Sequence, residues 1–397
     1  MNRRPKRPAP GSRRATALAV ALFVFGFGEE LWFRYLPAYL RTLGASVFGV
    51  GLFGTLKDLL DAAYAYPGGA ISDRLGTRRA LLFFGALSTA GFAVLWMWSS
   101  VIAVFAALFF VMAWASLGLP ATFSLVGEEL EGSRRVVGFT VQAILKRVPI
   151  VLAPPVGGFL IERYGMVSGM RIGIGVSIVL SIAMLVGLAR ALPRRPRETP
   201  ARSTPARVRL RPALRQLLIA DCFIRLCEGL PDVFLVVWAI EIVGVSPAQF
   251  GVLVSVLMAT AIASYIPAAA LAGRAEKKPF VLLTYVFFTL FPLAVLASRT
   301  FGHLLIAYAL GGLREIGEPA RKALIVDLAD PAARGRSVGL YYSIRGFAVA
   351  GAAAIGGALW TIRPSLTFEA AAVLGIVGTL WAARYLPRSS PRKEQPS

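Results

Sequence analysis

Long apolar blocks alternate with short polar segments along almost the whole chain. Each block has about the twenty residues that an α-helix needs to cross a membrane. We place the blocks at residues 15–40, 47–71, 79–98, 101–126, 136–161, 167–189, 213–240, 248–272, 279–298, 302–327, 336–361 and 365–386. The pattern predicts an all-α membrane protein with twelve transmembrane helices.

The composition supports this reading and excludes a set of soluble domains. Hydrophobic residues make up 56% of the 397 residues, and the mean hydropathy is +0.66. The net charge of +22 comes from 43 basic and 21 acidic residues. The basic residues gather in short segments between apolar blocks, without interleaved aromatic residues. We therefore expect anionic membrane lipids as partners, and no nucleic acid.

The basic residues also predict the orientation and the domain organisation. Most loop arginines and lysines fall on one side of the predicted membrane, which is the cytoplasmic side. The opposite side receives Arg41, Arg163, Arg171, Arg299 and Arg363. We expect a multi-pass protein of the cell inner (plasma) membrane, monomeric, with both termini in the cytoplasm. The expected parts are a disordered terminus at 1–14, a six-helix bundle at 15–189, a linker at 190–212, a second bundle at 213–386 and a disordered tail at 387–397.

The two halves of the chain repeat one another. Six residues recur about 200 positions later: Gly44, Ser46, Gly51, Pro67, Arg74 and Leu82 correspond to Gly244, Ser246, Gly251, Pro267, Arg274 and Leu282. A second group has a slightly smaller offset: Pro120, Lys146, Gly157 and Gly158 correspond to Pro319, Arg345, Gly356 and Gly357. The repeat predicts two pseudo-symmetric six-helix bundles, an arrangement common among secondary transporters.

A glycine-rich basic segment, Gly69-Ala70-Ile71-Ser72-Asp73-Arg74-Leu75-Gly76-Thr77-Arg78-Arg79, separates the second and third blocks. A plain positive-inside loop would require neither the aspartate nor the two glycines. The segment resembles the G-x-x-x-D-R-x-G-x-R-R signature of the major facilitator superfamily, and the spans, linker and halves extend this resemblance over nearly the whole chain. The resemblance implies a cytoplasmic gate formed by Gly69, Asp73, Arg74, Gly76 and Arg78, with Glu128 and Glu129 as partners.

The fifth block contains a second motif, Ala153-Pro154-Pro155-Val156-Gly157-Gly158. It resembles the G-P-x-x-G-G element of antiporters in the same family, with alanine in the first position. Proline residues kink a helix, and glycine residues permit close packing, here expected against the other half. A helix kink without any relation to antiport is nearly as good a reading of Pro154, Pro155, Gly157 and Gly158.

Many ionisable residues lie deep inside the predicted helices, where charge is costly and usually functional. A rise of about 1.5 Å per residue places Glu29, Glu228, Lys146 and Arg345 roughly 14–22 Å from the cytoplasmic helix ends. The candidates for lining a substrate cavity are Glu30, Arg34, Lys57, Asp58, Lys146, Asp232, Arg314, Glu318 and Arg345. Aromatic residues near this layer are candidates for stacking on a substrate or for packing: Trp32, Tyr35, Tyr64, Tyr66, Trp114, Trp238 and Tyr341.

Several of these charges are spaced to neutralise each other. Opposite charges lie four residues apart in Glu30–Arg34, Lys57–Asp61, Arg314–Glu318 and Glu318–Lys322. This spacing puts both members on one helix face, so structural salt bridges are an equal alternative to a substrate site. Glu29, Glu228, Asp232, Lys146 and Arg345 have no obvious partner on their own helices, which predicts pairs across helices, such as Glu29 with Lys146.

A carboxylate that exchanges a basic partner for a proton can couple protonation to a change of conformation. Glu29, Asp61 and Glu228 are the proton-coupling candidates. A nucleotide-binding loop and a nucleophile–histidine arrangement are missing from the sequence, and His303 and the cysteines Cys222 and Cys227 form no metal motif. We expect no cofactor, no metal and no enzyme activity.

The sequence predicts a secondary transporter of a small organic solute that works by alternating access. Proton-coupled export by antiport is the first expectation, which rests mainly on the motif in the fifth block. Uptake of an organic anion is the alternative, suggested by Lys146 and Arg345 at matching places in the two halves. A transporter-like sensor or a lipid-handling membrane protein is the alternative from a different class.

Overall fold

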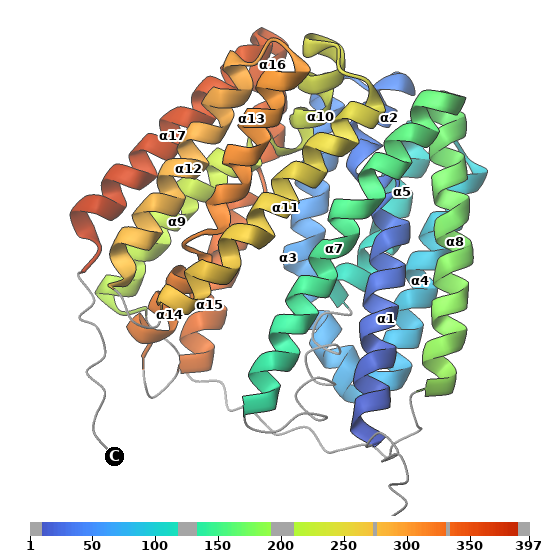
Figure 1. Cartoon of the computed structure of the whole chain (residues 1–397), viewed down its shortest axis with the longest axis horizontal. Coiled ribbons are helices and arrows are strands. Elements are labelled where there is room, and N and C mark those ends of the chain that lie inside the picture. Colours follow the sequence, from blue (N-terminus) through green and yellow to red (C-terminus); the bar gives the residue numbers. More distant parts are fainter. Residues whose placement is uncertain (1–9, 118–132, 192–209, 273–275, 331–333, 388–397) are drawn as a thin grey trace, which may run out of the picture. The chain divides into compact units, whose positions relative to one another are not determined.

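The computed structural model describes residues 10–117, 133–191, 210–272, 276–330 and 334–387 (Figure 1). Every regular element in these ranges is a helix. In parts of α3 (Val47–Leu75), α7 (Ser133–Tyr164) and α11 (Pro247–Ala272), the backbone is described but not all of the side chains. The helical composition confirms the all-α prediction.

The elements follow one another in twelve groups that match the predicted spans. The first half contains α1 (Pro10–Glu30), η1 (Phe33–Tyr35), α2 (Leu36–Thr42), α3, α4 (Thr77–Met97), α5 (Val101–Met112), η2 (Ala113–Leu117), α7 and α8 (Met166–Ala191). The second contains α9 (Pro212–Gly229), η3 (Asp232–Phe234), α10 (Leu235–Val237), η4 (Trp238–Val243), α11, α12 (Lys277–Ala297), α13 (Phe301–Gly312), η5 (Leu313–Glu315), α14 (Glu318–Leu328), α15 (Arg334–Val349), α16 (Ala352–Ile362) and α17 (Pro364–Tyr385). Six helical segments of the described residues are long and apolar enough to cross a membrane.

In the described part of the chain, four of the predicted spans are interrupted helices rather than continuous ones. The breaks separate α1 from α2, α9 from α10, α13 from α14, and α15 from α16. Three of them lie beside a proline: Pro37 is the second residue of α2, Pro231 directly precedes η3, and Pro319 is the second residue of α14. A proline lacks the N–H group for the helical hydrogen bond and clashes with the carbonyl four residues earlier. These interruptions place charged residues next to helix ends instead of within regular turns.

The break after the first helix and two of the turns repeat between the halves, in agreement with the internal repeat, whereas the break between α15 and α16 has no counterpart in the continuous α7. Helix α5 and helix α13 occupy the same positions 200 residues apart, and Ser100 and Thr300 cap their N-termini with side-chain oxygens. Gly44 and Gly244 both have left-handed backbones, with φ values of 89° and 79°. A side chain is strained in this conformation, so glycine is required at both turns.

The chain packs as two compact units, one of residues 1–34 with 63–202 and the other of residues 35–62 with 203–397. In the first unit, α1 packs against α7 and α8, and α4 packs against α5 and α8. In the second, α17 packs against α9 and α12, and α11 packs against α13. Residues 35–62, which include the first half of α3, belong to the second unit, whereas the sequence places them in the first bundle. The domain boundaries stay a prediction.

The glycines of the fifth span lie against a helix break of their own half. A Cβ atom at Gly157 would overlap the backbone carbonyl of Leu31, which directly follows α1. The equivalent Gly356 has the same relation to the carbonyl of Leu230, directly after α9. The nearest contacts of Gly157 therefore lie within its own half, and packing of Gly158 against the other half stays a prediction. Gly157 serves close packing of α7 on the break of α1, and α7 remains helical through Pro154 and Pro155.

We predict that Gly157→Ala and Gly356→Ala each lower the stability of the purified protein in thermal unfolding. The new methyl group would collide with backbone, and such overpacking costs about 1–3 kcal/mol. Gly187→Ala is the matched control, because nothing lies within 4 Å of a Cβ built there. Its stability should stay the same or rise by up to about 1 kcal/mol, since alanine favours helix more than glycine does. Equal stability of all three variants would contradict this role of the glycines.

Candidate functional site

The charged residues at the break of α1 form one of the predicted pairs. The Nε atom of Arg34 lies 2.8 Å from Oε2 of Glu30, which confirms the four-residue pair. The Glu30 side chain is 15% exposed and that of Arg34 is 38% exposed. Glu29 is half-buried beside this pair. The Lys146 side chain lies outside the described residues, so the pairing of Glu29 with Lys146 stays a prediction.

A second group of predicted candidates lies within the second unit. The Nζ atom of Lys57, on α3, lies 3.1 Å from Oδ2 of Asp232 on η3 and 3.4 Å from Oδ1 of Asp58. The prediction that Asp232 pairs across helices is therefore confirmed. Asp61 is exposed, and its pairing with Lys57 stays a prediction. Two carboxylates share one ammonium group here, and both are partly exposed.

The largest charged arrangement begins on α9. Asp221, Arg225 and Glu228 are spaced four and three residues apart, so they project from one face of that helix. Arg225 Nη1 lies 2.6 Å from Glu228 Oε2. The statement that Glu228 has no partner on its own helix is therefore wrong, because Arg225 lies one helical turn before it.

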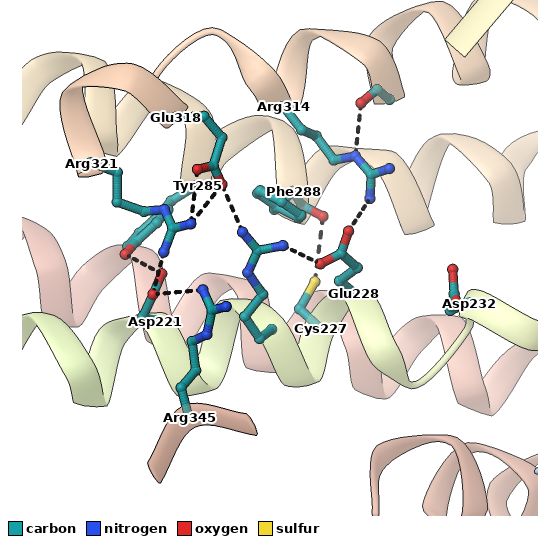
Figure 2. Close-up of polar contacts among 12 residues, drawn as sticks. Asp221, Cys227, Glu228, Asp232, Tyr285, Phe288, Arg314, Glu318, Arg321 and Arg345 are labelled. Carbon is teal, nitrogen blue, oxygen red and sulfur yellow. Dashed lines mark hydrogen bonds and ion pairs between the residues drawn. The ribbon is translucent and has the colours of Figure 1, made fainter. Parts of the chain in front are cut away.

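The other members come from three elements that surround this face of α9: η5, α14 and α15 (Figure 2). Glu318 of α14 accepts bonds of 2.7 Å from Nη2 of Arg225 and 2.7 Å from Nη2 of Arg321. Arg321 also pairs with Asp221 through its Nη1 atom. Arg345 of α15 lies 3.5 Å from Asp221, and Arg314 of η5 lies 3.6 Å from Glu228.

We call this arrangement the ion-pair chain. Its members, in spatial order, are Arg345, Asp221, Arg321, Glu318, Arg225, Glu228 and Arg314. Positive and negative charges alternate from one end to the other. Four guanidinium groups face three carboxylates, so one positive charge is in excess. The inner members Asp221, Arg321 and Glu318 are 1%, 3% and 5% exposed, whereas Glu228 near one end is 31% exposed.

Asp221 has more hydrogen-bond donors than any other carboxylate in the ion-pair chain. Its Oδ1 atom accepts the hydroxyl of Tyr285 at 3.0 Å, and Oδ2 accepts that of Tyr341 at 2.7 Å. Oδ2 also receives Arg321 and, at 3.5 Å, Arg345. Both tyrosines are buried. A buried carboxylate is tolerated when charge and hydrogen bonds compensate it fully, and here four donors do so.

Aromatic rings hold the arginines of the chain in place. Arg314 lies 4.9 Å from the Phe288 ring centre and 4.6 Å from that of Phe291, and it donates from Nε to the Gly311 carbonyl at 2.7 Å. Arg225 lies 5.3 Å from the Phe288 ring, and Arg345 lies 4.7 Å from the Tyr342 ring. Guanidinium groups are attracted to such ring faces. The rings therefore fix the direction of three of the four arginines.

Two of the predicted four-residue pairs are absent from the described part of the chain. Arg314 pairs with Glu228 instead of Glu318, because η5 and Gly317 interrupt the helix between them. Glu318 pairs with Arg225 and Arg321, while the Lys322 side chain is exposed. The four-residue rule applies only within an uninterrupted helix, so the prediction for Arg314 and Glu318 is wrong. Glu318 and Lys322 share the helix α14, but Glu318 turns to Arg225 and Arg321, so this predicted ion pair is wrong as well.

Three inner members, Asp221, Arg225 and Arg321, are not among the candidates from sequence. The spacing of Asp221, Arg225 and Glu228 on one helix face could have revealed the first two, and Arg321 follows Glu318 by three residues. The sequence holds no comparable signal for Tyr285, which comes from α12. The predicted aromatic candidates Trp32, Tyr35, Trp238 and Tyr341 are all buried in the core, as the packing alternative expects.

The predicted gate is only partly described. Gly76 forms the expected turn between α3 and α4 with a φ of 77°. Arg78 donates to the Ala189 carbonyl at 2.7 Å, and Arg74 is exposed. Gly69 and Asp73 lie where α3 has no described side chains, and Glu128 and Glu129 lie outside the described residues. The gate stays a prediction.

We predict that Asp221→Asn strongly destabilises the protein. Asparagine removes one of the two carboxylate partners of the buried Arg321, which keeps only Glu318. Breaking a buried ion pair costs about 3–5 kcal/mol. Glu369→Gln is the control, because Glu369 and its partner Arg363 are 37% and 60% exposed. An exposed pair contributes only about 0–1 kcal/mol. Chemical unfolding of the purified variants measures both, and equal effects would contradict a structural role for Asp221.

Comparisons with known proteins identify the family. The Major Facilitator Superfamily model matches residues 18–237 and 217–397. An uncharacterized MFS-type transporter of Methanocaldococcus jannaschii is 21% identical over 393 residues, which cover 93% of this chain and 94% of that protein. Sugar efflux transporter A of Escherichia coli is 25% identical over 274 residues, 66% of this chain and 67% of that protein. The crystal structure of peptide transporter POT in complex with sulfate has a TM-score of 0.76 at 18% identity and covers 97% of this chain and 96% of its own. This chain is therefore a multi-pass membrane transporter of the Major Facilitator Superfamily.

Proposed function

We propose that the protein is a secondary transporter that couples a proton to the movement of a small organic solute by alternating access. It would reside in the cell inner membrane with both termini in the cytoplasm, which the loop arginines favour. The observation that carries the proposal is the position of Glu228 in the ion-pair chain. It is a carboxylate inside a membrane helix, 31% exposed, and held by arginines on two sides.

Glu228 is the member of the chain that can accept a proton at the least cost. Arg225 contacts both Glu228 and Glu318, at 2.6 and 2.7 Å. If Glu228 becomes neutral, Arg225 therefore keeps Glu318 as a charged partner. Protonation of Asp221 or Glu318 would instead remove a partner from the buried Arg321, which is far more costly.

The position of Glu228 also supports a link between protonation and conformation. Glu228 is the second-last residue of α9, directly before the break that leads to η3. Its two arginine partners come from α9 itself and from η5, another interrupted segment. A neutral Glu228 holds both of these partners less strongly, so it loosens a contact between two interrupted helices.

We predict that Glu228→Gln abolishes the coupling between a pH gradient and solute flux in proteoliposomes, while flux down the solute gradient continues. Glutamine keeps the size and polarity of the side chain but cannot exchange a proton. Glu241→Gln is the control, because Glu241 forms an ordinary exposed ion pair of 3.3 Å with Arg41. Glu29→Gln and Asp61→Asn test the other two sequence candidates. Full coupling in all three variants would overturn the proposal of a carboxylate proton site.

Uptake of an organic anion together with a proton is the direction that the ion-pair chain favours. The chain has one positive charge in excess, and protonation of Glu228 removes a further negative charge. Binding of a proton therefore strengthens binding of an anion. The proton and the anion would then cross the membrane in the same direction. The motif in α7, which favoured antiport, has a packing explanation through Gly157 and its counterpart Gly356.

Proton-driven export is a second candidate, supported by the similarity to Sugar efflux transporter A. In this case the solute and the proton would compete, so a bound proton would weaken solute binding. An exported solute would need no negative charge. The two candidates thus differ in the sign of the coupling between proton and solute.

We predict that an inward proton gradient accelerates accumulation of the transported solute in right-side-out vesicles. The reason is the added positive charge at the ion-pair chain when Glu228 is protonated. Accumulation of a panel of labelled organic acids and sugars, with and without a protonophore, measures this. Accumulation that rises when the gradient is collapsed would favour export, and ligand binding without any flux would favour a sensor.

A further inference from the structure

We propose that Arg345 binds the carboxylate group of the transported solute and selects organic carboxylates over their neutral amides. This inference rests on the proposed function and names the class of solute. Arg345 lies on α15 at one end of the ion-pair chain, opposite the end at which Arg314 contacts Glu228 (Figure 2).

Arg345 is the least engaged of the four arginines. Arg321 makes bonds to two carboxylates, and Arg225 does the same. Arg314 lies 3.6 Å from Glu228 but also donates to the Gly311 carbonyl at 2.7 Å. Among the described residues, the only ion pair of Arg345 is the contact of 3.5 Å between its Nη1 and Asp221. This contact is long for a charge-assisted hydrogen bond, which is typically about 2.7–2.9 Å.

Asp221 cannot hold Arg345 more tightly, because its oxygens already serve other donors. Oδ1 accepts from Tyr285, and Oδ2 accepts from both Tyr341 and Arg321. Arg345 faces Oδ2, which offers about two acceptor positions, and both are taken by these closer partners. Arg345 is therefore the surplus cation of the ion-pair chain, both by charge count and by geometry.

The remaining nitrogens of Arg345 form a suitable binding fork. The Nε and Nη2 atoms make no hydrogen bond to any described residue, and the side chain is 21% exposed. The Tyr342 ring, 4.7 Å from the guanidinium carbon, limits the directions that the group can take. A planar guanidinium with two free nitrogens binds a carboxylate through two parallel bonds.

The binding fork of Arg345 predicts that the site binds carboxylates more tightly than neutral solutes of the same shape. A primary amide has nearly the shape of a carboxylate, but one of its two positions carries hydrogen atoms that face the donor. A bidentate charged pair is typically stronger than a neutral hydrogen bond by about 1.4 kcal/mol or more, a factor of about ten in affinity. Organic carboxylates should therefore bind at least about tenfold more tightly than the matched amides.

Binding to the full-length purified protein tests this through thermal stabilisation at constant ionic strength. The probes are benzoate with benzamide and nicotinate with nicotinamide, and inorganic sulfate tests for unspecific anion binding. We expect stabilisation by the carboxylates in the wild type, its loss in Arg345→Gln, and a weaker effect in Arg345→Lys, which keeps the charge without the fork. Arg345→Lys also serves if the glutamine variant does not fold.

Arg363→Gln is the matched control and should bind the carboxylates like the wild type, because Arg363 forms an exposed ion pair of 2.7 Å with Glu369. Equal binding of carboxylates and amides in the wild type overturns the proposal, and so does undiminished carboxylate binding in Arg345→Gln. Arg345-dependent binding of sulfate alone overturns the assignment to organic carboxylates.

Glu228→Gln should bind benzoate more tightly than the wild type, since it lacks a negative charge. A failure of proton coupling at Glu228 leaves the outcome for Arg345 unaffected, so the two proposals are tested separately.

Discussion

The pairing of the buried Asp221 carboxylate with arginine and tyrosine donors is the interaction on which the second half of this transporter depends. Three helices, α12, α14 and α15, donate to this carboxylate of α9, through Tyr285, Arg321 and Tyr341. In a membrane, apolar side chains gain little by leaving lipid for protein, so polar contacts and close packing hold helices together. The Asp221 carboxylate bonds to partners on three other helices, so it holds these four helices together.

The two halves share a scaffold but differ in their polar content. Both have a break after the first helix, with Leu31 or Leu230 covered by a glycine of the fifth helix of the same half. Among the described residues, the charged groups at the first break form a simple pair, Glu30 with Arg34, whereas the second half contains the seven-membered ion-pair chain. The two halves can thus keep the same packing contacts while only one of them contains the ion-pair chain.

The sequence was sufficient for the helices, the repeat and the family, because long apolar blocks and glycine turns act locally. It was insufficient for the ion pairs, since these depend on where helices break and which faces meet. Arg314 and Glu318 show this clearly: their spacing suggests a pair, but the break at η5 and Gly317 directs them to Glu228 and Arg225 instead. Tyr285 lies 64 residues from Asp221 in sequence, and nothing local connects the two.

The ion-pair chain has an odd number of members, and its parity has a consequence for sequence variation. An alternating chain with an odd number of members has the same sign at both ends, so its charges cannot sum to zero. Loss of an end member such as Arg345 leaves an even, neutral chain, whereas loss of an inner member such as Arg321 leaves adjacent carboxylates facing each other without a cation. Substitutions should therefore accumulate at the ends among related proteins that differ in their solutes, and the interior should change only in matched pairs.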